Sequence, residues 1–337
     1  MSVIYTTYLS KKVALLNVVA TVLIVVLHAL PPLRYGYPLD RTMPLYYLLS
    51  IVCQFGVPMF FFLSGYLFYS RCDSFVCVRE KLIRRIKTLL VPYLLWNALF
   101  VFLFFIMTRV DAVNGVMNMG KVINSARDVV VGVFDARFTP LWFVKILIYY
   151  TLLAPILFFC LNRKMLFAVL LFGSMVIAML CSCEKYDNIL LWLPVYLSGC
   201  SVGFYKPEIP KRPLLVATLC GALVCLIPLI YFGLISLTPL RLVGSIAIWF
   251  LVDWLWKSQI EEHFVVRKWM TYTFFIYCTH YFVLNILQKL SLLAFGAGST
   301  AMFLTFIITS FAAIALLVLV ARALSNYKVY RLLTGGR

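Results

Sequence analysis

Acidic residues are scarce in this sequence of 337 residues. It holds 12 Asp and Glu and only three His. Charged residues make up 12% of the chain, against about 25% in soluble globular domains. The few carboxylates form no clustered pair, and the sequence contains no HExxH, CxxC, P-loop or GxSxG pattern. These absences argue against metal catalysis and against ATP hydrolysis, and no metal site or permanently bound cofactor is expected.

Hydrophobic residues dominate what is present. They make up 64% of the chain, whereas soluble domains hold about 45–50%. A helix that spans a membrane needs about 20 mostly apolar residues, so the sequence predicts an integral, all-α membrane protein with about ten transmembrane helices. No soluble domain fits between them, and residues 1–337 are expected to form a single domain. The predicted spans are residues 13–30, 44–70, 89–109, 140–161, 165–181, 188–205, 214–233, 240–257, 271–290 and 299–321.

Basic residues outnumber acidic ones, 30 against 12, and give a formal net charge of +18. In a soluble protein such a charge is typical of nucleic-acid binding. Here the Lys and Arg cluster in short segments between apolar runs without any RNA-binding pattern, so no nucleic-acid partner is expected. With the N-terminus inside, 20 of the 30 basic residues lie in inner segments, which predicts cytoplasmic N- and C-termini.

One histidine, His28, is set into the apolar run VLIVVLHAL. If the first helix begins near Val13, His28 lies roughly 22 Å into a hydrocarbon core of about 30 Å. An ionisable group at such depth is costly unless it faces a cavity within the bundle, which favours a functional role. A neutral imidazole is also suited to accept a proton from a hydroxyl nucleophile. The alternative is a structural imidazole that hydrogen-bonds a neighbouring helix.

A dense group of cations precedes the third span. We name it the basic collar, and it consists of Arg79, Lys81, Arg84, Arg85 and Lys87. Such a cluster anchors a membrane protein to anionic lipid headgroups and needs no further role. The guanidinium group of arginine also binds phosphates well through its paired N–H groups. The sequence therefore leaves two roles open for the collar, either a membrane anchor alone or an anchor that is also a phosphate site.

Other polar residues also stand inside apolar runs. Trp142 begins the fourth span, where an interfacial aromatic belt is the simplest role, and Lys145 either snorkels outward or faces a cavity. Tyr277 and His280 stand three residues apart on one helix face, and His280 is as plausible a structural residue as a site residue. Glycines in the second span favour close helix packing.

An ordered set of motifs runs through most of the chain. It begins with His28 in the first span and continues with GVPMFFFLSGYLF, RRIKTLLVPYLLW, LWFVKILIYY, WLPVYLSGCSVGFY and FIYCTHYFVL. Together these motifs resemble acyltransferase family 3. The resemblance implies a ten-helix enzyme of the bacterial inner membrane that moves an acyl group, commonly acetyl, from acyl-CoA onto a sugar of a surface polysaccharide, lipid or antibiotic.

The resemblance also implies roles for particular residues. His28 matches the histidine that is held to be catalytic, and it is expected to be the general base. The family usually has an arginine where this sequence has Asn17, so Asn17, Lys11 or Lys12 would meet the donor there. Donor-binding residues are expected to be Arg79, Arg84, Arg85, Lys87 and Asn17. Acceptor-binding residues are expected to be Trp142, Lys145, Tyr277, His280 and Asp40. Asp40, in the outer loop after His28, is also a candidate to orient the imidazole, although nothing in the sequence places it nearby.

A transporter or flippase of a small metabolite or lipid-linked glycan is the main alternative, because the same buried polar residues would line a path across the membrane. Inverted repeats with paired broken helices would favour it, and the sequence has none, although Pro and Gly interrupt the second and sixth spans. A structural subunit of an envelope complex is a third reading, against which the buried His28 and Lys145 argue.

Overall fold

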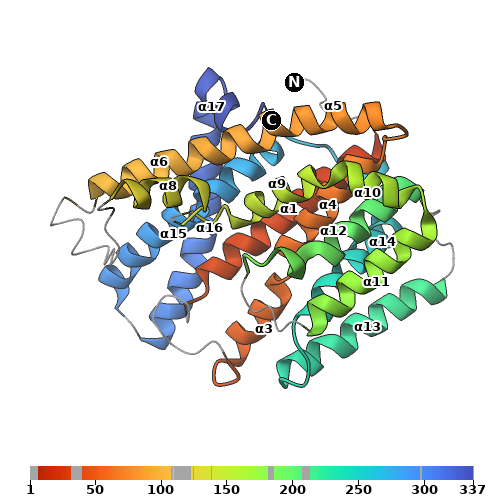
Figure 1. Cartoon of the computed structure of the whole chain (residues 1–337). Helices are drawn as coiled ribbons and strands as arrows, with labels where there is room; N and C mark the ends of the chain where they lie inside the picture. Colours follow the sequence, from red (N-terminus) through yellow and green to blue (C-terminus); the bar gives the residue numbers. More distant parts are fainter. Residues whose placement is uncertain are drawn as a thin grey trace.

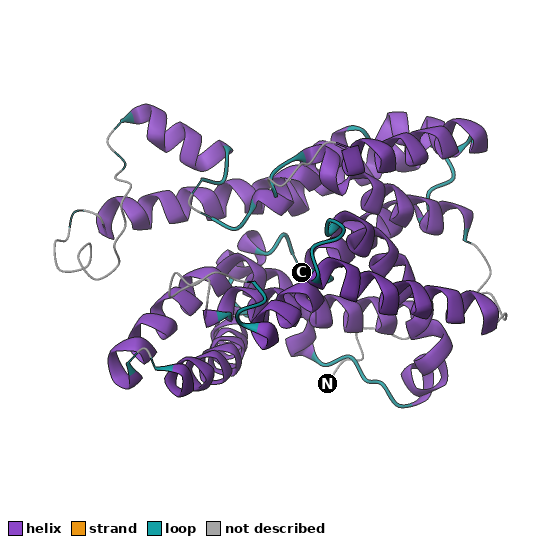
Figure 2. Cartoon of the chain, turned by 90° about the horizontal axis from the view of Figure 1, so that it is seen from below, coloured by secondary structure: helices purple, strands orange, loops and turns teal. Residues whose placement is uncertain are grey.

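A computed structural model describes residues 7–31, 40–107, 109, 123, 125–137, 139–180, 186–206, 213–296 and 298–336. Helices are the only regular elements in these ranges, so the all-α prediction is confirmed. Figures 1 and 2 show two views of the resulting bundle, in which α5 and α6 run end to end along one side.

The first half of the chain forms α1 (Tyr8–Ala29), α3 (Pro44–Cys53), α4 (Gly56–Tyr69), α5 (Phe75–Arg85), the π-helix η1 (Ile86–Leu90), α6 (Val91–Met107), α8 (Ala126–Phe134), α9 (Trp142–Leu152) and α10 (Ala154–Leu161). The second half forms α11 (Lys164–Leu180), α12 (Ile189–Tyr205), α13 (Pro213–Tyr231), α14 (Thr238–Glu262), the 3₁₀ helix η2 (Lys268–Tyr272), α15 (Thr273–Phe295), α16 (Ser299–Leu324) and α17 (Lys328–Leu333).

Every one of the ten predicted spans coincides with a helix or a pair of helices. Within the described residues, five helical stretches are long and apolar enough to cross a membrane: Tyr8–Ala29, Pro44–Tyr69, Phe75–Met107, Thr238–Glu262 and Thr300–Leu324. The pair α9 and α10, which bends by 59°, would make a sixth if it is counted as one span. The apolar helices α11 and α12, and the described part of α13, are shorter. The number of spans therefore stays a prediction. The single helix expected over 140–161 is broken because Pro155 lacks an N–H and clashes with the carbonyl one turn back.

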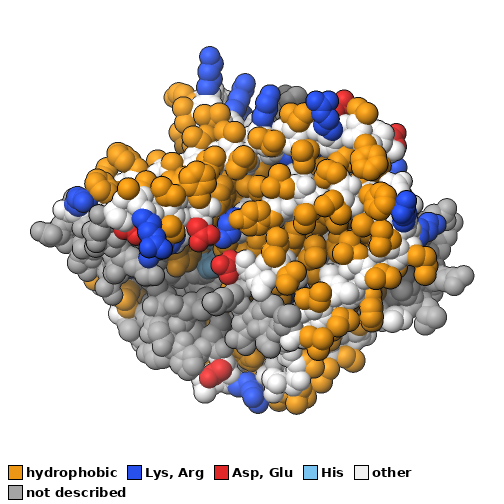
Figure 3. All heavy atoms as spheres, viewed as in Figure 1, with side chains coloured by type: hydrophobic (Ala, Val, Ile, Leu, Met, Phe, Trp, Pro, Cys, Tyr) orange, Lys and Arg blue, Asp and Glu red, His pale blue; other side chains and the backbone are white. Residues whose placement is uncertain are grey.

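The outer surface of the bundle is apolar. On α11, Met165 is 80% exposed and Leu180 is 76% exposed, and Val169 and Phe172 are also largely uncovered. Hydrophobic side chains cover much of the described surface in Figure 3, with Lys and Arg grouped along its top edge over α17 and α5. A water-soluble protein rarely exposes contiguous apolar area of this kind, whereas lipid covers it readily.

Glycines bring α4 and α12 into backbone contact at the centre of the bundle. A Cβ on Gly199 would lie 2.0 Å from the carbonyl oxygen of Phe62, and one on Gly65 would lie 2.4 Å from that of Tyr196. Small residues allow this close approach. Van der Waals packing between the helices then holds them together in lipid, where no hydrophobic driving force acts between helices. The packing role predicted for the glycines of the second span is therefore confirmed.

Two lysines tie α1 to α14. The helix begins at Tyr8, earlier than predicted, so Lys11 and Lys12 lie inside it. Lys12 is buried with its Nζ 2.7 Å from Asp253 Oδ1, and the hydroxyl of Tyr8 donates to the same carboxylate. Lys11 Nζ donates to the carbonyl of Glu261 at 2.7 Å. Both amines are therefore engaged on the α14 side of α1.

A π-turn separates α5 from α6. The N–H of Val91 bonds the carbonyl of Ile86, five residues earlier, which widens the helix at η1. Pro92 follows at once and has no N–H for the carbonyl of Thr88. The sequence thus interrupts the α-helical pattern directly after Arg85, the last residue of α5.

Candidate active site

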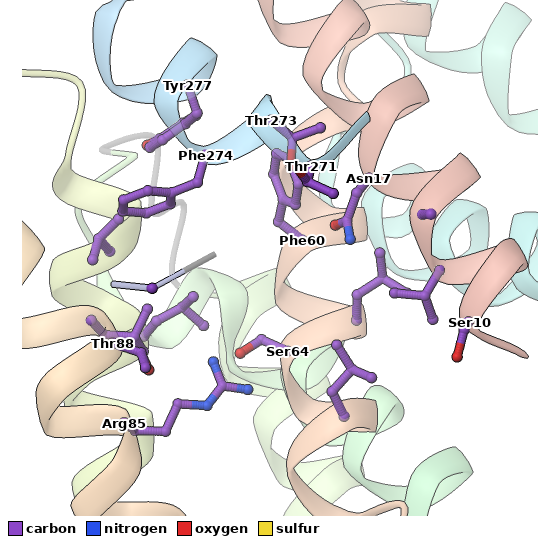
Figure 4. Close-up of a pocket in the computed structure, with 18 of the residues that line it drawn as sticks. Ser10, Asn17, Phe60, Ser64, Arg85, Thr88, Thr271, Thr273, Phe274 and Tyr277 are labelled. Atoms are coloured by element: carbon purple, nitrogen blue, oxygen red, sulfur yellow. The ribbon is translucent and has the colours of Figure 1, made fainter. Parts of the chain in front are cut away.

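One end of the bundle contains a cavity of about 940 Å³. Figure 4 shows side chains of α1, α4 and α15 directed into it, together with Arg85 and Thr88 from the α5–η1 segment. We call the end lined by Ser10, Arg71, Lys81, Lys268 and Gly336 the mouth of the cavity. Ser64, Leu63 and Phe60 line it progressively farther from Arg71 along α4. The start of α1 and the end of the described chain thus share this cavity.

The first helix presents one face to the cavity. Its lining residues are spaced three or four apart, as one side of a helix requires. They are Leu9, Ser10, Val13, Ala14 and Asn17. Asn17, at the position where the resemblance implies an arginine, therefore faces the cavity. Neither Lys11 nor Lys12 is among the residues that line it.

Four cations line the cavity and no acidic residue does, within the described part of the chain. The cations are Arg71, Lys81, Arg85 and Lys268. The guanidinium of Arg85 points inward toward Ser64 in Figure 4. A hollow lined by one sign of charge with apolar walls concentrates the field and attracts anions.

The basic collar is divided by its position on the helix. Lys81 and Arg85 face the cavity, and Lys81 also donates to the carbonyl of Phe68. Arg79, Arg84 and Lys87 are exposed and do not line it. The collar therefore has an inner pair at the cavity and an outer set on the surface.

Three aromatic rings that line the cavity lie in contact with one another. We call Phe60, Phe143 and Tyr277 the aromatic wall. Their ring centroids are 5.7 Å apart for Phe60 and Phe143, 5.6 Å for Phe143 and Tyr277, and 6.2 Å for Phe60 and Tyr277. All three line the cavity. They come from α4, α9 and α15, so three helices meet at this point.

The two intramembrane histidines lie together beyond the aromatic wall. The ring of Tyr277 is 5.9 Å from that of His280, and the ring of His280 is 5.2 Å from that of His28. Tyr281 meets His28 edge to face at 5.4 Å on another side. His280 is fully buried and His28 half-buried, and His28 does not itself line the cavity.

Hydrogen bonding sets the tautomer expected for His280. Its Nδ1 lies 2.7 Å from the carbonyl oxygen of Tyr277, which can only accept, so Nδ1 carries the proton of the neutral ring. Nε2 is then an acceptor, and it is buried without a hydrogen-bond partner in the structure described. Leaving a buried polar group unpaired costs about 1–3 kcal/mol. The unpaired Nε2 is therefore suited to accept a hydrogen bond from an N–H or O–H group during function.

The remaining predicted residues lie apart from the cavity. Lys145 pairs with Asp135 at 2.7 Å, and Trp142 packs on Trp192 with ring centroids 5.5 Å apart. Asp40 is exposed and accepts hydrogen bonds from the hydroxyl and the amide of Thr42, which lower the pKa of its carboxyl. No contact between Asp40 and His28 is present among the described residues.

Several cavity residues carried no signal in the sequence. Phe60 and Phe143 stand in long apolar runs, where nothing separates a wall residue from a lipid-facing one. Arg71 and Lys268 looked like ordinary inner-loop charges. Their position at the cavity mouth depends on how α4, α5 and η2 come together, which residue spacing alone does not give.

A polytopic helical bundle with an apolar surface, a cavity lined by cations, and two histidines in ring contact indicates an integral membrane protein with a candidate site for an anionic ligand. The sequence model of the acyltransferase domain of acyltransferase family 3 matches residues 12–322. The chain belongs to this family and is a membrane acyltransferase. Comparison with curated proteins and with solved structures gave no match.

Proposed function

We propose that this protein transfers an acyl group, acetyl in the first place, from acyl-CoA to a hydroxyl of a sugar in a cell-surface or lipid-linked glycan. We place it in the inner membrane of a bacterium. The observation that carries the proposal is the cavity itself, which is cationic at its mouth and ends at an aromatic wall with His28 and His280 directly behind.

The cavity suits an acyl-CoA in the polarity of its lining. The phosphates of CoA would meet Arg71, Lys81, Arg85 and Lys268, because cationic side chains form strong charge-assisted hydrogen bonds with phosphate oxygens. The hydroxyls of Ser64 and Thr88 and the amide of Asn17 supply polar partners for the amides of the pantetheine arm. The thioester, at the far end of that arm, would then reach the aromatic wall.

The transfer needs one proton movement. His28 accepts the proton of the sugar hydroxyl as its oxygen attacks the thioester carbonyl carbon, the C–S bond breaks, and the departing CoA sulfur takes the proton from His28. An ester and free CoA result, and the imidazole returns to its neutral form. The unpaired Nε2 of His280 is suited to accept a hydrogen bond from a ring N–H of His28. The other ring nitrogen of His28 would then be directed at the sugar hydroxyl.

Purified protein supplied with labelled acetyl-CoA and a lipid-linked acceptor tests the proposal. His28→Ala should lower kcat by about 10²–10⁴-fold, the usual contribution of general-base catalysis. His263→Ala is the matched control, since His263 is exposed beyond the end of α14 and away from the cavity. Full transfer by His28→Ala would refute the assignment.

Transport of a metabolite or glycan is the competing function. The family match favours transfer. Substrate counterflow in proteoliposomes without any dependence on acyl-CoA would support transport instead.

A further inference from the structure

We propose that Phe60 is the gate between the donor cavity and the histidine pair, and that it sets the length of acyl group the protein accepts. This inference rests on the proposed acyl-CoA-dependent transfer. It assigns a specificity-determining role to a phenylalanine that makes no polar contact with any described residue.

The aromatic wall lies between the two halves of the site. Phe60, Phe143 and Tyr277 line the cavity, and His280 is in ring contact with Tyr277 on its other side. His28, the proposed base, is one ring further on and does not line the cavity. A thioester held in the cavity therefore reaches His28 only if part of the wall moves.

Two members of the wall are fixed. The hydroxyl of Tyr277 donates to the carbonyl of Pro140, and the side chain is only 4% exposed. Phe143 is 7% exposed and packs edge to face on Phe61, with ring centroids 4.6 Å apart. Displacing either residue would break a buried hydrogen bond or a tightly packed ring contact.

Phe60 is the member that can move. It is the only one of the three that is half-buried, and its aromatic contacts in the described structure are Phe143 and Tyr277 themselves. Phe60 borders the open space of the cavity, so a change of its χ1 rotamer into that space would open the wall. Side-chain rotamer changes of this kind are fast compared with catalysis.

Such a gate selects by size. An acetyl group requires a small opening, whereas each further methylene of a longer acyl chain must also find room among the wall residues. One methylene too many in an apolar pocket reduces kcat/KM by about 10–200-fold. The wall is therefore expected to favour short acyl groups and to exclude bulk water from the thioester.

The test compares two truncations on the same face of α4. Phe60 and Leu67 both line the cavity, Phe60 at the wall and Leu67 two helical turns nearer the mouth. The kcat/KM values for acetyl-, butyryl- and hexanoyl-CoA would be measured for wild type, Phe60→Ala and Leu67→Ala with one acceptor. We expect the ratio of hexanoyl to acetyl transfer to rise at least about tenfold in Phe60→Ala and to stay at the wild-type value in Leu67→Ala.

Phe60→Leu keeps a bulky apolar side chain and should give an intermediate ratio, and monodisperse elution in detergent checks that each variant folds. An unchanged ratio in Phe60→Ala, or an equal change in Leu67→Ala, would refute the gate while leaving acyl transfer in place. Loss of acetyl transfer in both folded Phe60 variants would also refute it, because an opened gate admits acetyl. A wild-type protein that transfers no acyl group from any acyl-CoA would overturn the proposed function itself.

Discussion

Arg84 and Arg85 are neighbours in the sequence and are placed differently in the structure. Arg85 lines the cavity, whereas Arg84 is exposed and does not. One step along a helix rotates a side chain by about 100°, and here that step separates Arg84 on the surface from Arg85 in the cavity lining. The sequence supported a phosphate role for both arginines equally, and the cavity lining makes Arg85 the candidate to test.

Arg85→Gln is therefore expected to raise the KM for acetyl-CoA. A hydrogen bond to a charged group contributes about 1.5–3 kcal/mol, which corresponds to roughly tenfold to a hundredfold in affinity. Arg84→Gln is the control and should stay close to wild type. Steady-state kinetics with varied acetyl-CoA would measure both, and an equal rise in the two variants would contradict a specific phosphate contact.

The histidines show what a sequence can and cannot specify at this scale. His28 was recognisable because an ionisable side chain is rare in an apolar run. Its contact with His280 was not predictable, because it depends on how α1 and α15 are rotated about their axes. The same holds for Lys12, whose partner Asp253 lies on α14 and gave no sign of being buried.

At the scale of elements, the contact between α4 and α12 organises the centre of the bundle. The two helices approach through Gly65, Gly199 and Gly203, each without room for a Cβ. Runs of apolar residues predicted where most helices lie, and Pro and Gly residues predicted some of the helix breaks. The sequence analysis did not predict the bend between α9 and α10 or the π-turn at η1. Both depend on which backbone hydrogen bonds form around a proline, which has no N–H to donate.

Gly199→Ala should destabilise the folded protein. Its added Cβ would lie 2.0 Å from a backbone oxygen of Phe62, which cannot give way as a flexible side chain would. Overpacking of this kind costs about 1–3 kcal/mol. Gly173→Ala on α11 is the control, because nothing lies within 4 Å of its Cβ, and it should be neutral or stabilising. Thermal unfolding in detergent would measure both, and similar midpoints would argue against the packing described.

At the scale of the whole molecule, both ends of the described chain lie at the cavity mouth. Leu9 and Ser10 at the start of α1 and Gly336 after α17 line the same cavity. Ends on one side require an even number of membrane crossings, in agreement with the ten predicted spans. Most basic residues of the cavity and the collar gather at this end as well, which the positive-inside rule assigns to the cytoplasm.

The orientation can be measured with single cysteines and a membrane-impermeant maleimide, using the parent protein as the labelling blank. Ser236→Cys, in the exposed turn between α13 and α14, should react in intact spheroplasts. Asn326→Cys, exposed between α16 and α17, should react only after the membrane is opened. The opposite pattern would put the cationic mouth outside the cell, away from the cytoplasmic pool of acyl-CoA, and would contradict donor entry through this cavity. The expected pattern would bring the donor in from the cytoplasm and put His28, near the other end of α1, toward the side where surface glycans are found.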